Sequence, residues 1–156
     1  DVEVIRDMSR IIDDGAFMGC EATHKCAPGL GLGANPGLGL YKEILNYYEK
    51  IHFSEDKKNL LTVVDYTSEI LRKHGWKGNG DIEKVDNVYI YPSQFFCPLD
   101  YTTGKLTITD DTYSIHWYTA SWQSKYSHFK TKVQRLLGKK MTKYIIEIKG
   151  IIKGRK

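Results

Sequence analysis

The sequence lacks a long apolar run. It contains nothing close to the roughly 18 consecutive apolar residues that a membrane-spanning helix requires, so we expect no such helix. Its first residues, DVEVIRDMSR, are acidic and mixed and lack the pattern of a secretory signal. The 156 residues are 41% hydrophobic and 27% charged, which is typical of one folded domain and argues against disorder.

Cysteine is scarce, and an odd count excludes a disulfide framework. No two of the three cysteines, Cys20, Cys26 and Cys97, have the CxxC spacing, so a structural zinc site is not expected. We interpret them as small buried side chains in a reducing, cytoplasmic compartment. The sequence also has no HExxH, GxSxG or P-loop motif, and nothing pairs a cysteine with a base.

Charge of one sign is concentrated at the end of the chain. Residues 139–156 hold seven basic residues and one acid, whereas residues 1–138 hold 16 basic and 18 acidic residues. A nucleic-acid-binding domain spreads its charge over one face of the fold, so we expect no nucleic-acid partner. The apolar residues of 139–156 recur at helical spacing between lysines. This pattern fits a peripheral contact with the inner face of a membrane, or a last element packed on the core.

Hydrophobic periodicity predicts a mixed α/β fold. The expected strands are 2–5, 16–20, one strand through 85–91, 105–109 and 112–118. The expected helices are 40–52, 60–74 and 122–137, with a polar turn or short helix at 7–14 and a turn at 79–81. Strict alternation of strand and helix is absent, so we expect helices against a mixed sheet rather than a regular doubly wound one.

A glycine run, GLGLGA, occupies residues 29–34. It matches the loose form of the dinucleotide fingerprint, but Pro28 precedes it and Asn35-Pro36-Gly37 interrupts the helix that this fingerprint requires. Two other interpretations stay open. The run is a tight turn before the helix at 40–52, or it is a loop whose glycines, Gly31 and Gly33 among them, let backbone approach a ligand.

Two short patterns could bind a metal or an anion. Asp1 and Glu3 share one face of a strand and could hold a hard cation, although exposed acids at a chain end are a simpler explanation. His116 ends a strand, and Ser121 and Trp122 begin the next helix, where free N–H groups favour an anion. The alternative is a surface histidine, with Trp117 and Trp122 anchoring the core.

The combination of these pieces resembles one family. The run VYIYPSQFFCPLDYTTGKLTITDDTYSIHWYTASW (88–122) closely resembles the C-terminal signature of the family 32 glycosyltransferases. The matching elements are Tyr91-Pro92, Phe96-Cys97-Pro98, His116-Trp117 and Ser121-Trp122. The start, DVEVIRDMSRIIDDGAFMGCE, resembles the segment that begins at the second aspartate of the family's DXD motif, and APGLGLGANPG resembles the loop that follows.

The resemblance implies a GT-A nucleotide-diphospho-sugar transferase fold and Mn²⁺ or Mg²⁺ as cofactor. By motif, Asp1 corresponds to a metal ligand, and His116 to a contact of the metal or the diphosphate. Ser121 and Trp122 correspond to donor phosphate contacts, and Gly31 and Gly33 to the loop that lines the acceptor sugar. No residue stands out as a covalent nucleophile, and the family's transfer is expected to retain anomeric configuration.

The expected function is therefore metal-dependent transfer of a sugar from a UDP- or GDP-sugar to a glycan or lipid-linked acceptor, as in capsular polysaccharide or lipopolysaccharide synthesis. Residues 1–138 would be the C-terminal part of the catalytic domain, and 139–156 a basic tail. Two departures qualify this. The first DXD aspartate and the N-terminal part of the domain are missing, and Ala27 stands where many relatives carry Asn. The alternative is a non-catalytic sugar- or nucleotide-binding module, or an inactive remnant.

Overall fold

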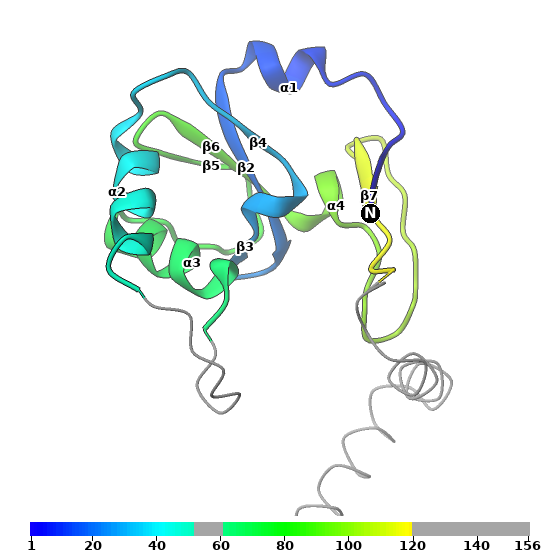
Figure 1. Cartoon of the computed structure of the whole chain (residues 1–156). Helices are drawn as coiled ribbons and strands as arrows, with labels where there is room; N and C mark the ends of the chain where they lie inside the picture. Colours follow the sequence, from blue (N-terminus) through cyan, green and yellow to red (C-terminus); the bar gives the residue numbers. More distant parts are fainter. Residues whose placement is uncertain (52–60, 120–156) are drawn as a thin grey trace, which may run out of the picture. The chain divides into compact units, whose positions relative to one another are not determined.

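The computed structural model describes residues 1–51 and 61–119 (Figure 1). These residues fall into two compact units, which we describe separately. The larger unit comprises Val2–Pro98 and Ile108–His116. The smaller comprises Asp1, Leu99–Thr107 and the chain from Trp117 onward.

A mixed sheet forms the centre of the larger unit. Its strands lie in the order β3-β2-β6-β5, and β4 also pairs with β2. The bounds are Ala16–Ala22 for β2, Lys25–Cys26 for β3, Leu32–Gly33 for β4, Glu83–Val85 for β5 and Val88–Tyr91 for β6. Strands β2 and β6 run parallel, and every other pair in this sheet is antiparallel. The mixed α/β architecture expected from the sequence is thus confirmed.

Two helices form the main hydrophobic core with one face of this sheet. Helices α2 (Gly39–Tyr48) and α3 (Val63–Lys73) lie on the same side of the strands in Figure 1. Met18 and Val88 from the sheet are fully buried in one cluster with Leu71 of α3, and Leu40 of α2 belongs to the same cluster. Burial of such side chains contributes about 1.5–3 kcal/mol each, so this cluster dominates the stability of the unit.

Aromatic rings cover the other face of the sheet. Phe17 of β2 stacks on Phe96 of the short helix α4 (Ser93–Phe96), with ring centroids 5.7 Å apart. Tyr91 meets Phe96 edge-on at 5.8 Å, and Phe95 stacks on Tyr113 at 6.0 Å. Offset and edge-on aromatic pairs of this kind add about 0.5–1.5 kcal/mol beyond the area they bury. Strand β2 is therefore covered on both faces.

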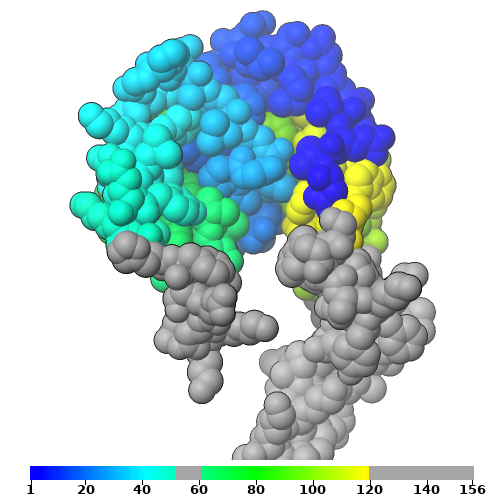
Figure 2. Space-filling model, in the orientation of Figure 1, coloured from blue at the N-terminus to red at the C-terminus, as the bar shows by residue number. Residues whose placement is uncertain are grey.

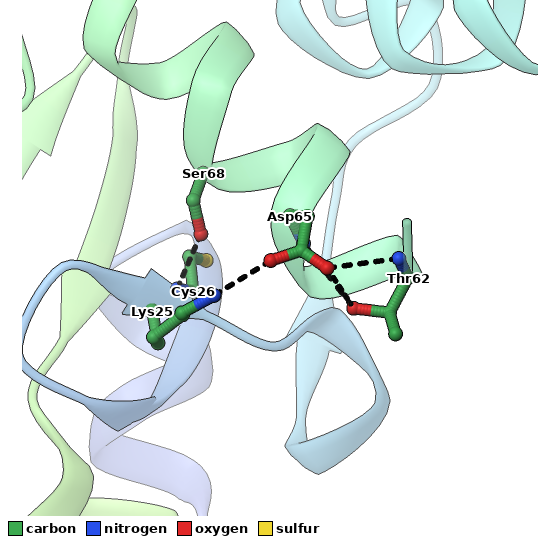
Figure 3. Close-up of polar contacts among 5 residues, drawn as sticks. All are labelled: Lys25, Cys26, Thr62, Asp65 and Ser68. Carbon is green, nitrogen blue, oxygen red and sulfur yellow. Dashed lines mark hydrogen bonds and ion pairs between the residues drawn. The ribbon is translucent and has the colours of Figure 1, made fainter. Parts of the chain in front are cut away.

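Polar contacts fix the N-terminal end of α3 against the sheet (Figure 3). Thr62 and Asp65 form a capping box in which each side chain accepts from the backbone N–H of the other residue. Asp65 also binds Lys25 of β3 at 2.6 Å, and the Ser68 hydroxyl accepts from the backbone N–H of Cys26 at 2.9 Å.

The C-terminal end of α3 is held by one histidine. His74 lies 2.8 Å from a carboxylate oxygen of Glu43 on α2, and its other ring nitrogen contacts Asp86 in the turn between β5 and β6. The hydrogen bond to Glu43 is the main cause that raises the pKa of His74, and both carboxylates act in this direction. Helix α3 is thus tied at both ends to neighbouring elements.

The structure corrects the strand predicted through 85–91. The chain instead turns back at Asp86-Asn87, and β5 and β6 form an antiparallel hairpin. Both turn residues have positive φ angles, 45° and 65°, as the primed two-residue hairpin turns require. The apolar residues on either side of the turn concealed this break.

Two further differences concern short elements. The strand predicted at 105–109 does not form, and Leu106 makes only an isolated antiparallel bridge to Leu99. Strand β3, helix α4 and the 3₁₀ turn Pro28–Leu30 were not predicted. These elements are two to four residues long, too short for a periodic pattern. The structure confirms that Cys20, Cys26 and Cys97 are buried, and no disulfide joins these three.

Thr62→Ala should destabilise the chain by about 1 kcal/mol, because the Asp65 N–H loses its capping acceptor. The midpoint of urea unfolding measures this loss. Thr107→Ala, an exposed threonine in the smaller unit, is the matched control and should leave the midpoint unchanged. Equal midpoints for the two variants would contradict a stabilising role for the cap.

The free energy of unfolding should also fall in acid, because the Asp65 carboxylate becomes protonated. The hydrogen bond from Lys25 is the largest cause that lowers the pKa of Asp65 from 3.8 to about 2. A carboxyl group whose pKa is lower in the folded than in the unfolded state stabilises the folded state at any pH above the unfolded-state pKa. This stabilisation is lost as the pH falls through the folded-state pKa. Urea midpoints should therefore drop between pH 4 and pH 2. Lys25→Met should flatten this drop, whereas Lys42→Met, at an exposed lysine of α2, should not.

Candidate functional site

The two ends of the described chain meet in a small antiparallel sheet. Strand β1 (Val2–Val4) pairs with β7 (Ser114–His116), with Val2 opposite His116 and Val4 opposite Ser114. Figure 2 shows the blue atoms at the start of the chain directly against the yellow atoms of this later segment. Further along, the backbone N–H of Ile5 donates to the Tyr113 carbonyl at 2.9 Å. Both strands were predicted, but their pairing was not.

Asp1 is held by the segment that follows β7. Its carbonyl accepts from the backbone N–H of Trp117 at 3.0 Å. Its carboxylate Oδ2 accepts from both the backbone N–H of Thr119 and the Thr119 hydroxyl, the latter at 2.8 Å. Between these donors, Tyr118 has a positive φ of 51°, a conformation that bulky residues rarely adopt. The turn at Tyr118 belongs to the same segment as both N–H groups that bind Asp1.

His116 is half-buried at the end of β7. Burial is the main cause that lowers the pKa of its imidazole, although the charge of Glu21 acts in the opposite direction. The ring is therefore neutral at pH 7, the form in which imidazole binds metals and accepts hydrogen bonds. The two residues before His116 in β7, Ser114 and Ile115, are both buried, at 2% and 3% exposure.

The described side chains do not form a complete metal site of their own. Within residues 1–51 and 61–119, no three histidine, cysteine or acidic side chains gather where they could hold one ion. A carboxylate such as that of Asp1, or an imidazole such as that of His116, would each need phosphate oxygens and water to complete the shell of Mn²⁺ or Mg²⁺. Such incomplete protein shells are usual for Mg²⁺ bound with a nucleotide.

The glycine run packs against aromatic rings. A methyl group at Gly33 would lie 2.4 Å from the Phe17 ring, and one at Gly31 would touch the same ring at 3.4 Å. The Tyr41 hydroxyl lies 2.9 Å from the carbonyl oxygens of both Phe17 and Gly33, which fixes β4 beside β2. The overlap explains why Gly33 is small without a ligand, whereas a methyl group at Gly31 would make ordinary contact. The role of both glycines toward an acceptor sugar stays a prediction.

Several predicted positions lie outside the described residues. These are Ser121, Trp122, the helix predicted at 122–137 and the basic segment 139–156. Trp117 is described and is 40% exposed, so it does not anchor the core. Of the helices in the described part of the chain, none is both long and apolar enough to cross a membrane.

Sequence reasoning missed one hollow region of the larger unit. Asp14, Asp81, Tyr89, Tyr91 and Gln94 line a cavity of about 380 Å³. Asp81 was noted only as part of a turn, and Tyr91 only as a strand end and as part of the Tyr91-Pro92 element of the resemblance. The available signal was the alternation in VYIY, which puts two tyrosines on one face of a strand.

Gly33→Ala should destabilise the chain by about 1–3 kcal/mol, because the added methyl group overlaps the packed ring of Phe17. Gly29→Ala is the control within the same loop, since its methyl group would meet no atom within 4 Å. Thermal unfolding of both variants tests this. A Gly33→Ala protein as stable as Gly29→Ala would show that the loop is not held against Phe17.

The geometry thus comprises a carboxylate held at the start of the chain, a neutral imidazole at the end of β7, and a separate hollow lined by acids and tyrosines. Comparison of the chain with protein-family models, curated proteins and solved structures finds no match.

Proposed function

We propose that this chain is part of a metal-dependent glycosyltransferase of the GT-A type. It would transfer a sugar from a UDP- or GDP-sugar to a glycan or lipid-linked acceptor. The observation that supports this most directly is the pairing of the chain start with the segment around β7. It aligns Val2 with His116, and Asp1 with Trp117 and Thr119. The start of the chain and the segment around β7 both resemble segments of the family 32 glycosyltransferases, and hydrogen bonds join these two segments in the fold.

In this proposal the chain's own residues prepare a site for the donor diphosphate. Thr119 orients the Asp1 carboxylate through two hydrogen bonds to its Oδ2. The lowered pKa of His116 keeps the imidazole neutral, so it adds no charge and offers a nitrogen lone pair. Mn²⁺ or Mg²⁺ bound there with the diphosphate would stabilise the negative charge that develops on the leaving group.

A thermal-shift series with the 156-residue chain tests this proposal. UDP, GDP and NAD are each added with Mn²⁺ or with EDTA. A nucleoside diphosphate at a hundredfold excess over its Kd adds about 2.7 kcal/mol to stability, a rise on the order of 5–10 °C. We expect that rise with UDP or GDP, only with Mn²⁺, and not in His116→Ala. His24→Asn is the control, because asparagine tolerates the positive φ of this exposed position.

Three outcomes would count against the proposal. The first is a shift with NAD alone, which would favour the dinucleotide interpretation of the glycine run. The second is a nucleotide shift that persists in EDTA and in His116→Ala. The third is the absence of any shift. A Mn²⁺-dependent shift without turnover of any UDP- or GDP-sugar would favour the non-catalytic binding module.

A further inference from the structure

The cavity of about 380 Å³ lies entirely within the larger unit. Four stretches of chain form its walls. Helix α1 (Ser9–Asp13) and the following residue contribute Arg10 and Asp14, and the turn at 80–82 contributes Asp81. The remaining walls are the segment from Tyr89 to Phe95 and the loop 111–113. Its volume falls in the range of small-molecule sites, about 300–1,000 Å³.

A second cavity of about 160 Å³ continues the first. The two share four lining residues, Gly80, Asp81, Pro92 and Gln94, and the second extends to Cys20 and Thr23. We call the two together the trough. It passes the carboxyl ends of the parallel strands β2 and β6, which is the edge where α/β sheets usually bind ligands.

Tyrosines with fixed orientations line one side of the trough. The Tyr91 hydroxyl donates to Asp14 Oδ2 at 3.1 Å, and Lys84 of β5 lies over the ring of Tyr89 at 4.7 Å. Burial, followed by the contact with Asp14, raises the pKa of Tyr91 to about 12, so the hydroxyl stays protonated and keeps its hydrogen bond to Asp14. Tyr91 is buried and Tyr89 is half-buried, so of these two rings Tyr89 is the one that can offer apolar surface to the C–H groups of a sugar.

The charged residues of the trough disfavour an anion. Asp14, Asp81 and Asp111 contribute three carboxylates, and Arg10 is the one cation among the lining residues of these two cavities. Carboxylates repel the phosphates of a nucleotide sugar but accept strong hydrogen bonds from hydroxyl groups. The amide of Gln94 can both donate and accept. The lining thus suits a ligand rich in hydroxyl groups and without negative charge.

We propose that the trough binds an uncharged oligosaccharide chain, with sugar hydroxyls on Asp81, Asp111 and Gln94 and a sugar C–H face on the half-buried ring of Tyr89. The assignment of this chain as the acceptor, rather than a stored or regulatory glycan, rests on the proposed function. The trough is distinct from the residues that we assign to the donor diphosphate.

Saturation-transfer NMR with the 156-residue chain tests this proposal without nucleotide or metal. The probes are the neutral disaccharides mannobiose, lactose and cellobiose, with spermidine and inorganic pyrophosphate as charged competitors. We expect at least one disaccharide to bind saturably in the millimolar range. Asp81→Asn and Asp111→Asn should each weaken that binding roughly tenfold, because a charge-assisted hydrogen bond becomes a neutral one.

Asp110→Asn is the matched control for Asp111→Asn, since Asp110 precedes it in the chain but does not line the trough. Amide spectra establish that each variant is folded. Equal binding by all variants, no saturable disaccharide binding, or displacement of the sugar by spermidine or pyrophosphate would each overturn the proposal. The NMR experiment contains no sugar nucleotide, so saccharide binding can be measured even if the thermal-shift experiment with nucleotides fails. A thermal shift with a nucleotide but no saccharide binding would refute the proposal for the trough and leave the proposed function standing.

Discussion

The described fold depends on the burial of both faces of strand β2. Met18 and Ala16 face the helices α2 and α3, while Phe17 faces the aromatic cluster of α4. Since adjacent side chains of a strand point to opposite faces, a strand buried on both sides must be apolar throughout. The neighbours of β2 must then satisfy its backbone, and β3, β4 and β6 do so. Gly19 and Gly33 are small because Phe96 and Phe17 occupy the adjacent space.

This arrangement separates the residues that support the fold from those available for chemistry. The rings that fill the space beside β2 also position α4, whose carbonyl at Phe95 accepts from the Tyr113 N–H at 2.8 Å. That bond leads directly into β7, where Ser114 pairs with Val4. A packed aromatic cluster thus determines where the strand bearing His116 runs. The hydroxyls of Tyr89 and Tyr91 belong to the same face but border a hollow.

The local elements with a strong pattern could be predicted from the sequence, and the pairings between them could not. The apolar run of β2 and the helical spacing of α3 were sufficient to place both. The hairpin at Asp86-Asn87 was missed because its two strands are short and both apolar at the turn. The partner of β1 lies more than a hundred residues away, and a period-two pattern carries no information on such a partner. The trough was missed because its walls come from five separate stretches of the chain.

The pairing of Val2 with His116 also constrains how the chain is made. Contacts between residues so distant in sequence carry a large loop-closure entropy and form slowly compared with local ones. During synthesis, the residues of β1 leave the ribosome long before β7 exists, at about 5–20 residues per second. For several seconds Val2, Val4 and Ile5 therefore have no partner strand from this sheet, and β1 can pair only after the whole of the larger unit has been synthesised.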